Sequence, residues 1–503
     1  MSTMKIGWSE ISITSEKKVS LAGQFAERIS EYVEKPLTAT AMAVEADGAQ
    51  MVLCSADLSG ISLNLTEDVR ARLADNEEGL DPEKVILCAI HTHTGPVYPK
   101  ASRRSRAAGG ATKTSELLKA MLPEGRKYVE KAPVSNNPDI EPQKETYAML
   151  VKNLSKVVLD AWKARTEGGF ANAFGRAAVG MCRRAVYSDG SAKMWGETNT
   201  AIFKEVEGGS DSGMELLYVF NGEKKLSGIV VNLACPAQCV QHRLFVSPDF
   251  WGEVKVRLRK RFGEGIFMLP LCSAAGDQCP VDIVRWVEPY SDVNDPNIER
   301  LYPVRRKADP SMFDLDGMRM VGRRIAREVI DIYEDGVDEV QLEIPFTHVV
   351  RHMHLPIRRV SAKETMEAEK AIREYLRDHP GDVDYNDAAK LQIHLGTISR
   401  SRLQEKLDLL DTEVHIIRMG SVAIATNPFE LFLDYGNQIK ARSKAEQTFL
   451  VQLACHSEGY LPTEKAEKGG HYSAFVSSGS CGHEGGDLLV RETLTEIEAL
   501  FAD

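Results

Sequence analysis

The chain has 503 residues, of which 43% are hydrophobic and 27% charged, a composition typical of a soluble globular protein with a real core. The formal net charge of -11 argues against general nucleic-acid binding, and no apolar run approaches the roughly 20 residues that a membrane helix needs. The N-terminal residues lack the apolar core of a signal peptide. With nine cysteines, an odd number, we expect reduced thiols and a cytoplasmic protein without a membrane span.

The first predicted unit consists of a hairpin, a helix and a strand. The dipeptide Asp47-Gly48 separates two segments with strand character and is typical of a tight hairpin turn. The predicted elements are strands at 37–44 and 50–58, a helix at 66–74 and a strand at 85–90. The last strand is apolar throughout and rich in β-branched residues, which indicates burial on both faces.

Two histidines stand where this strand breaks into a loop. The chain continues as His91-Thr92-His93, and Gly95-Pro96 ends the strand. Alternation in an extended chain points both imidazoles to the same side. Such a pair at the carboxyl end of a buried strand is suited to metal binding or proton transfer. This stretch alone leaves a second interpretation open, which is a pair of ordinary hydrogen-bonded loop histidines.

An insertion at about 98–140 has no clear period and is rich in basic side chains. We interpret it as a loop or lid beside the histidines, with a solvated surface insertion as the alternative. Its basic residues include Lys100, Arg103, Arg104, Arg106 and Lys113. Apolar residues at helical spacing then predict a helix from Tyr147 to Ala161, before Gly168-Gly169.

The order of hairpin, helix and strand occurs twice more, without a repeat at the level of residues. The second unit has strands at 216–220 and 226–234, a helix at 251–261 and a strand at 266–271. The third has strands at 414–418 and 422–426, a helix at 431–441 and a strand at 448–454. We therefore predict an α/β fold of mixed β-sheets flanked by helices, in which the loops at three strand ends converge on one site.

Two more segments interrupt the three units. Residues of about 282–312 are irregular and charged, and residues of about 362–410 predict two helices, at 363–378 and 387–409, joined by His379-Pro-Gly-Asp. We interpret the second segment as a helical hairpin insertion. Either segment could border a substrate cleft.

Five motifs taken together resemble those of the neutral ceramidase family. In chain order they are HTHTGP at 91–96, AAGDQCP at 274–280, NPFE at 427–430, GYLPT at 459–463 and Gly470-His-Tyr472. The resemblance is to the N-terminal catalytic domain of that family and covers most of the chain. It implies a single catalytic domain over residues 1–503, carrying the insertions described above, and zinc-dependent hydrolysis of an N-acyl amide.

The resemblance also implies roles for individual residues. His91, Glu430 and Tyr460 match metal-binding positions of the family. His93 matches a histidine near the reacting carbonyl, and Tyr472 matches a tyrosine that faces the substrate oxyanion. Together they would activate water, polarise the carbonyl, transfer a proton and stabilise the oxyanion.

Some assignments stay open. Arg184 matches a substrate-pocket arginine, although Arg183 aligns as easily. Three further histidines occupy the same region of the sequence, and any one of them is an alternative acid–base residue. They are His456, His471 and His483.

The sequence departs from the family at Pro236, where the family has a further metal-binding histidine. Proline has no side-chain ligand, so a replacement would be Gln238, Cys235, His242, water or nothing. An amide oxygen is a weak ligand for zinc, which prefers nitrogen and sulfur. We predict Gln238 as the replacement ligand, and therefore expect either a less tightly bound zinc or another divalent metal.

A second departure is Cys279, which replaces a family serine near the scissile amide. A thiol ionises more easily than a hydroxyl and is intrinsically nucleophilic. Three interpretations remain: a nucleophile, a metal ligand, or a small residue in a tight turn.

These observations favour a metal-dependent hydrolase that cleaves an amide or related acyl bond in a small polar, possibly anionic substrate. Because no export signal is seen and the chain ends soon after the last motif, we do not expect ceramide itself to be the substrate. One alternative is a metal-free thiol hydrolase using Cys279 and His93. Another is a non-catalytic ligand-binding protein on the same fold. A homo-oligomer is left open.

Overall fold

Two β-sheets form the centre of the fold in the computed structural model, which describes residues 3–24, 27–107, 114–129, 137–285, 313–336 and 340–502. The larger sheet orders its strands as β16-β14-β13-β8-β1-β5-β6-β7. They are β1 (Lys5–Ser12), β5 (Thr38–Ala46), β6 (Ala49–Ala56), β7 (Val85–Ala89), β8 (Thr166–Arg176), β13 (Gly213–Asn221), β14 (Leu226–Leu233) and β16 (Phe267–Cys272). The smaller sheet orders its strands as β18-β19-β20-β22, which are β18 (Phe346–Pro356), β19 (Leu409–Met419), β20 (Val422–Thr426) and β22 (Gln447–Val451).

The three predicted hairpin–helix–strand units are confirmed. In each unit the hairpin is antiparallel, and the strand after the helix lies parallel to the second hairpin strand. The connecting helices are α1 (Leu63–Leu73), α5 (Phe250–Phe262) and α10 (Leu433–Arg442). In the first hairpin, Asp47 and Gly48 have φ angles of 49° and 79°, and positive φ at both positions is what a two-residue type I′ turn requires.

Alternation along the strands assigns side chains to separate cores. On β5, Ala39, Ala41 and Ala43 face the helices, whereas Met42 and Val44 belong to the core shared with the smaller sheet. That shared core also contains apolar residues of β19, β20 and β22. The two sheets therefore pack face to face, and the strands need apolar residues on both faces.

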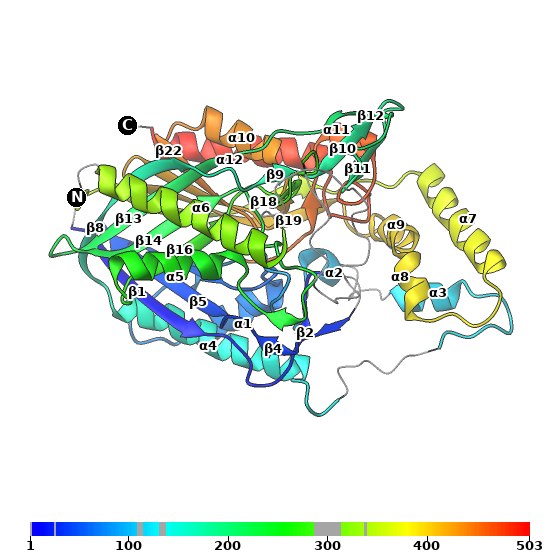
Figure 1. Cartoon of the computed structure of the whole chain (residues 1–503), viewed down its shortest axis with the longest axis horizontal. Helices are drawn as coiled ribbons and strands as arrows, with labels where there is room; N and C mark the ends of the chain where they lie inside the picture. Colours follow the sequence, from blue (N-terminus) through cyan, green and yellow to red (C-terminus); the bar gives the residue numbers. More distant parts are fainter. Residues whose placement is uncertain are drawn as a thin grey trace.

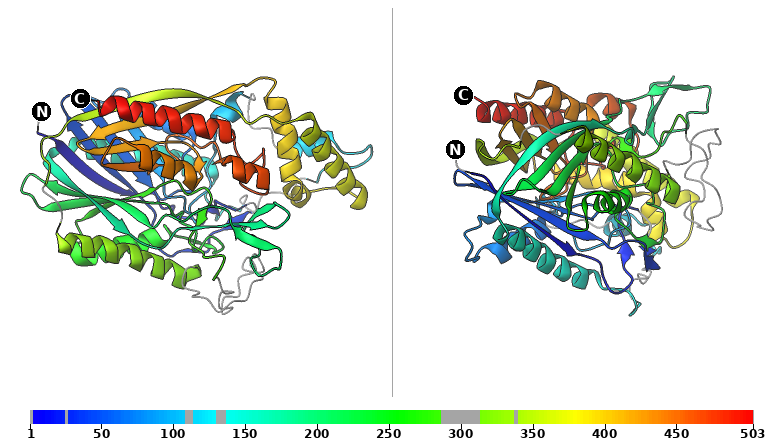
Figure 2. Two further views of the ribbon diagram at one scale, coloured as in Figure 1. Left: turned by 90° about the horizontal axis from the view of Figure 1, so that it is seen from above. Right: turned by 60° about the vertical axis from the view of Figure 1, so that its left-hand side comes forward.

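Helices cover the outer faces of both sheets, which gives four layers (Figure 1). α1 and α4 (Gln143–Lys163) pack on one half of the larger sheet, and α5 and α6 (Asp314–Asp335) pack on the other half. α10 and α12 (His483–Leu500) cover the smaller sheet. Figure 2 shows α6 and α12 on opposite sides of the strands.

A small group of helices has its own hydrophobic core at one end of the molecule (Figure 1). They are α3 (Thr114–Ala120), α7 (Ala362–Asp378), α8 (Tyr385–Lys390) and α9 (Gln392–Leu403). The prediction of one helix over 387–409 is wrong, because Leu391 leaves helical geometry with ψ at 1° and Leu409 already starts β19. The separate core agrees with a helical insertion, but the division into one catalytic domain with three insertions stays a prediction. Residues 108–113, 130–136 and 286–312 of the predicted insertions lie outside the described residues.

Short strand pairs carry the loops that meet at the strand ends. β21 (Glu430–Leu431) pairs in parallel with β23 (Tyr460–Leu461), and β9 (Met181–Cys182) pairs with β17 (Gln278–Cys279). β10 (Arg184–Tyr187) lies between β11 (Ala192–Met194) and β12 (Phe203–Val206). The remaining short elements are β2 (Ser20–Leu21), β3 (Arg28–Ile29), β4 (Tyr32–Val33), β15 (Phe245–Val246), α2 (Arg103–Ala107), α11 (Glu464–Gly469) and the 3-10 helix η1 (Pro82–Lys84).

The expectations of no membrane span and of reduced cysteines can be compared with the described residues. Among these residues, no helix is both long enough and apolar enough to cross a membrane. All nine cysteines lie within the described ranges, and each is a buried free thiol.

Candidate active site

His91 is held at the end of β7 by a hydrogen bond that defines its tautomer. The residue turns the chain with a φ of 64° and is 8% exposed. Its Nδ1 lies 2.5 Å from the carbonyl oxygen of Ser59, which can only accept a hydrogen bond, so Nδ1 carries the proton. In a neutral ring this leaves a lone pair on Nε2.

Glu430 and Tyr460 are brought together by the pairing of β21 with β23, where they are direct partners in register. The loop after β16 packs against them so closely that a Cβ atom added at Gly276 would lie 2.2 Å from the carbonyl oxygen of Glu430. The carboxylate Oε2 of Glu430 lies 3.4 Å from His91 Nε2. Three segments far apart in the chain thus place an imidazole, a carboxylate and a phenol in one cluster.

The electrostatics of the cluster favour a carboxylate beside a neutral phenol. Burial alone would raise the pKa of Glu430, but the charge of His91, hydrogen bonds from His91 and Tyr460, and the Arg183 guanidinium together hold it below its ordinary value. Burial and the nearby Glu430 charge raise the pKa of Tyr460 well above its ordinary value. Tyr460 therefore donates its hydroxyl hydrogen to Glu430.

His93 lies beside His91 and is also held in one tautomer. Its Nδ1 lies 3.0 Å from Gln241 Oε1, an oxygen that also accepts a hydrogen bond from Gln24 Nε2. Its Nε2 accepts from Gln238 Nε2 at 3.0 Å and lies 3.4 Å from His91 Nε2. Burial, followed by the nearby His91, lowers the pKa of His93 well below its ordinary value. His93 is therefore a neutral imidazole that is able to take up a proton.

Arg183, rather than Arg184, is the arginine that faces this cluster. Its guanidinium donates to Gln238 Oε1 at 3.1 Å and to the carbonyl oxygen of Gly276 at 3.0 Å, and it lies 3.4 Å from the Tyr460 hydroxyl. Because Arg183 holds the amide oxygen, Gln238 turns its NH₂ group toward His93. In this arrangement Gln238 is a hydrogen-bond donor, and the oxygen that was predicted to bind a metal is not directed at the cluster.

Tyr472 packs edge-on against Tyr460, with ring centroids 5.4 Å apart and a hydrogen bond between the two side chains. It therefore stands beside the cluster, as the resemblance implied for a residue that faces the substrate. Arg184 is fully buried and forms a two-bond ion pair with Glu207, at 2.7 and 3.0 Å. That pair leaves its guanidinium out of the cluster, so a direct role of Arg184 in substrate binding does not follow from this geometry.

Cys279 is fully buried and lies in the short strand β17, directly after the turn at Gly276 and Asp277. Its sulfur lies 3.1 Å from the carbonyl oxygen and 3.4 Å from the backbone nitrogen of Val281. Burial raises the pKa of the thiol to about 12, although Arg183 acts in the opposite direction. Of the three interpretations of Cys279, this environment favours the small structural residue, since a nucleophile needs an accessible thiolate.

The hydrogen bonds around His91 turn its Nε2 lone pair toward the Glu430 carboxylate. The nearest polar neighbours of His91 Nε2 are Glu430 Oε2 and His93 Nε2, both at 3.4 Å. His91 Nε2 and Glu430 Oε2 are both acceptors in the tautomer described above, so a proton on His91 or a metal cation would join them, whereas the His93 Nε2 lone pair already accepts from Gln238. Imidazole nitrogen, carboxylate oxygen and a phenol form a donor set that suits zinc. The residues present therefore fit a divalent metal held by His91, Glu430 and Tyr460.

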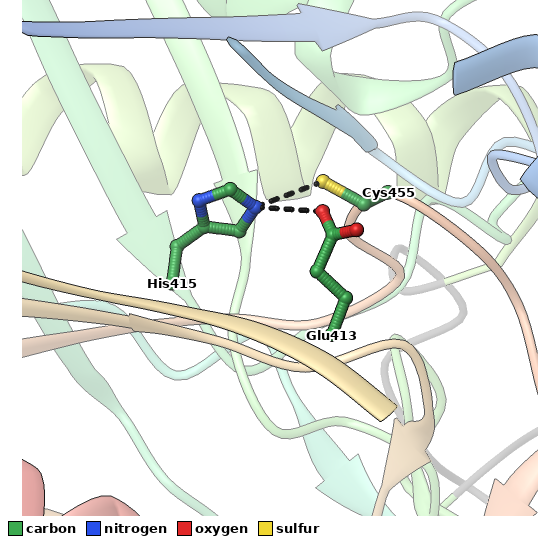
Figure 3. Close-up of side chains that lie close together, drawn as sticks. All are labelled: Glu413, His415 and Cys455. Carbon is green, nitrogen blue, oxygen red and sulfur yellow. Dashed lines mark hydrogen bonds and ion pairs between the residues drawn. The ribbon is translucent and has the colours of Figure 1, made fainter. Parts of the chain in front are cut away.

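A second group of ligand-type side chains lies between β19 and the loop after β22. Among the described residues, Glu413, His415 and Cys455 form a candidate metal-binding group, with ligand atoms within 4.8 Å of one another. His415 Nε2 faces both partners, at 2.9 Å from Glu413 Oε1 and 3.4 Å from Cys455 Sγ (Figure 3). Arg70 Nη2, however, lies 2.7, 3.4 and 3.6 Å from the three ligand atoms in that order. The guanidinium thus occupies the position that a metal ion would take.

Five other residues singled out in the sequence have partners of their own or are buried. His483 bonds to Glu467 at 2.9 Å, and His471 accepts a hydrogen bond from the backbone of Met194. His456 is fully buried, and burial lowers its pKa to about 3. Lys100 donates to Ser59 Oγ at 3.1 Å, and its charge interacts with Glu430. Lys100 is therefore the basic residue of the predicted lid that lies at the cluster, while Arg103 pairs with Asp411.

Fold and cluster together define an α/β protein with a histidine–carboxylate–tyrosine centre at converging strand ends, and solved structures show where else this fold occurs. Neutral ceramidase from Pseudomonas aeruginosa matches with a TM-score of 0.64 and 17% sequence identity, covering 100% of this chain and 75% of that one. A ceramidase complexed with C2 matches with a TM-score of 0.65 and 15% identity, covering 99% and 75%. No family model and no curated protein matches the sequence. The resemblance inferred from the motifs is thus confirmed at the level of the fold.

Several residues of the centre carried no signal in the sequence. Ser59 acts through its backbone carbonyl, and Arg28 reaches the His93 carbonyl oxygen at 2.6 Å from a distant strand. Gln241 follows Gln238 by three residues, but neither spacing nor residue type marks it as a partner of His93. Contacts of this kind depend on the fold and not on a local pattern.

Proposed function

We propose that this protein is a metal-dependent hydrolase that cleaves an amide or related acyl bond in a small polar substrate. The observation that carries the proposal is the pair of facing acceptors, His91 Nε2 and Glu430 Oε2, with the Tyr460 hydroxyl beside them. A divalent cation satisfies them, and the fold neighbours are ceramidases by name. Ceramide contains an N-acyl amide, so the same chemistry is a reasonable expectation for this chain.

The residues of the centre have complementary tasks in such a reaction. A divalent ion held by His91, Glu430 and Tyr460 would supply a Lewis acid that polarises a carbonyl and makes water more acidic. His93, a neutral imidazole with Nδ1–H anchored on Gln241, accepts the proton of the attacking water at Nε2 after that nitrogen exchanges Gln238 for water. His93 then returns the proton to the leaving amine. The Tyr472 hydroxyl donates to the developing oxyanion.

Positive charge at the cluster supports a substrate with an anionic group. Lys100 is exposed and lies at Ser59, whose carbonyl holds His91. Arg183 adds a buried positive charge on the side of Tyr460. A carboxylate or similar group near the scissile bond would pair with Lys100 without needing to displace another protein carboxylate.

The test uses two acyl compounds that differ in charge, N-butyrylglycine and N-butyrylethanolamine. We expect metal-dependent release of the amine, loss of turnover after dialysis against a chelator, and its return with added Zn²⁺. The glycine compound should have the higher kcat/KM, and Lys100→Met should remove that preference. No turnover of either compound or of the matching esters would contradict the hydrolase. Turnover without a preference would contradict only the anionic group.

A further inference from the structure

The loop that carries Tyr472 has an energetically unfavourable backbone conformation. Gly470, His471 and Ser473 all have a φ of 72°. For a residue with a side chain, this left-handed conformation costs on the order of 1–2 kcal/mol and persists only where the surroundings impose it. His471 and Ser473 flank Tyr472 directly. The ring of Tyr472 is therefore presented by a strained segment that needs external support.

Arg184 supplies much of that support. Its Nη1 donates to the carbonyl oxygen of Tyr472 at 3.1 Å and to Ser473 Oγ at 3.2 Å, and its Nη2 donates to the carbonyl oxygen of Gly470 at 2.9 Å. A further bond at 3.3 Å reaches the carbonyl oxygen of Ala466, in α11. One planar guanidinium thus ties together the residues of the strained segment and the helix before it.

Glu207 supplies the negative charge that allows the Arg184 guanidinium to be buried. It pairs with Arg184 Nε and Nη2, and both side chains are almost fully buried, at 0% and 5% exposure. A buried guanidinium without a partner charge would be strongly unfavourable. Glu207 is itself held by its backbone, where its N–H donates to the Arg184 carbonyl and its carbonyl oxygen accepts from Lys465 Nζ at 2.5 Å.

Arg183, which precedes Arg184, connects this chain segment to the cluster of His91, Glu430 and Tyr460. Successive side chains of an extended chain point in opposite directions, and Arg183 accordingly reaches Tyr460, whereas Arg184 reaches the backbone of Tyr472. The two tyrosine rings meet edge to face. The Arg183-Arg184 dipeptide therefore fixes both members of the tyrosine pair relative to each other.

We propose that Arg184 and Glu207 are positioning residues that hold the strained 470–473 segment, and so place the Tyr472 hydroxyl against Tyr460. This inference rests on the proposed function for the role of Tyr472 in catalysis. The placement of the ring can be tested without turnover. Arg184 acts through the backbone of Tyr472 and does not contact the substrate.

The first experiment reads the position of Tyr472 directly. Protein labelled with 3-fluorotyrosine gives ¹⁹F signals, and the signal of Tyr472 is the one lost in Tyr472→Phe. Arg184→Lys keeps the charge but loses the planar fork, so it should shift or broaden that signal. Arg165→Lys is the control, because Arg165 forms a partly buried pair with Glu45 elsewhere, at 14% and 30% exposure. If Arg184→Lys does not fold, Glu207→Gln takes its place with the same expectation.

The second experiment separates positioning from a general structural role. With N-butyrylglycine, Arg184→Lys should lower kcat by about 10–100-fold, because a small displacement of a reacting group has effects of this size. In the Tyr472→Phe background the same change should alter kcat less than about twofold, since the hydroxyl that it places is already gone. If Arg184→Lys instead caused a general loss of structure, its effect on kcat would multiply with the effect of Tyr472→Phe.

The outcomes distinguish the two proposals. An unchanged Tyr472 signal in folded Arg184→Lys and Glu207→Gln, or multiplicative effects in the kinetic cycle, would overturn the positioning role. A wild-type protein that hydrolyses none of the probes would contradict the proposed function, and the ¹⁹F result would then still decide whether Arg184 places Tyr472.

Discussion

His91 Nε2 and His93 Nε2 lie 3.4 Å apart, but only His91 directs its lone pair at Glu430, because the lone pair of His93 Nε2 accepts from Gln238. A lone pair that faces a carboxylate is unfavourable unless a positive charge, either a proton or a metal ion, joins the two groups. The two histidines nevertheless have different surroundings. His91 contacts the carboxylate, whereas His93 is bonded to two glutamines.

This difference predicts different consequences of replacing the two rings. His93→Gln should lower kcat by about 10²–10⁴-fold, the usual size of a general acid–base contribution, while bound metal is retained. Turnover and metal content are measured on the same samples. The matched control is His483→Gln, because His483 pairs with Glu467 at the start of α12. Loss of the metal in His93→Gln would instead make His93 a ligand.

Removing the Tyr472 hydroxyl should affect the reaction and not the fold. Tyr472→Phe keeps the ring that packs on Tyr460 and should lower kcat by about 10²–10³-fold, as the loss of one oxyanion donor does. Tyr187→Phe is the control, because the Tyr187 hydroxyl bonds to the Glu197 carbonyl. Equal kcat values for wild type and Tyr472→Phe would remove the tyrosine from the mechanism.

Cys279 should be dispensable for turnover. The thiol is fully buried against Val281 and its pKa is raised to about 12 by burial, so Cys279→Ala should retain activity and lose on the order of 1 kcal/mol of stability. Steady-state kinetics and urea unfolding measure the two effects. An inactive but folded Cys279→Ala protein, together with inactivation of wild type by iodoacetamide, would favour the thiol hydrolase.

The Arg70–Glu413 pair predicts a pH-dependent contribution to stability. Burial alone would raise the pKa of Glu413, but hydrogen bonds from His415 and Arg70 outweigh it and hold the pKa below its ordinary value of 4.5. The folded-state pKa is the lower one, so the stabilisation is complete above pH 4.5 and is lost as the pH falls below it. Glu413→Gln should therefore cost about 3–5 kcal/mol at pH 7, where it leaves Arg70 unpaired.

Urea unfolding of wild type and Glu413→Gln from pH 7 to pH 3 tests the direction of this pH dependence. The difference in the free energy of unfolding between wild type and Glu413→Gln should become smaller as the pH falls. Glu464→Gln, which alters an exposed surface pair with Lys468, should show little difference at any pH. A difference that grows in acid would show that the folded-state pKa of Glu413 lies above its unfolded value.

The sequence was sufficient to predict the three units because their signals are local. Hairpin turns such as Asp47-Gly48 and alternating apolar residues determine strands without reference to the rest of the chain. Gly168-Gly169, in contrast, lies within β8 and not at a helix end. Added Cβ atoms there would come within 2.7 Å of the Phe220 carbonyl and 2.4 Å of the Gln341 carbonyl. These glycines permit close approach of distant segments, which no local pattern reveals.

The candidate site could likewise be predicted from the sequence only in part. His91, Glu430 and Tyr460 could be named from motifs, and the register of β21 with β23 brings the last two together. The choice between Arg183 and Arg184 could not be made, because a shift of one residue turns a side chain to the other face of a strand. The orientation of Gln238 likewise depends on Arg183, which reaches it from the position between β9 and β10.

The most direct test of the account is the metal content of purified wild type, His91→Ala and Glu430→Ala, measured by elemental analysis beside hydrolysis of N-butyrylglycine. We expect wild type to hold about one divalent ion at this centre, and both variants to lose it together with activity while His483→Gln keeps both. Metal and activity retained in both His91→Ala and Glu430→Ala would contradict the central claim.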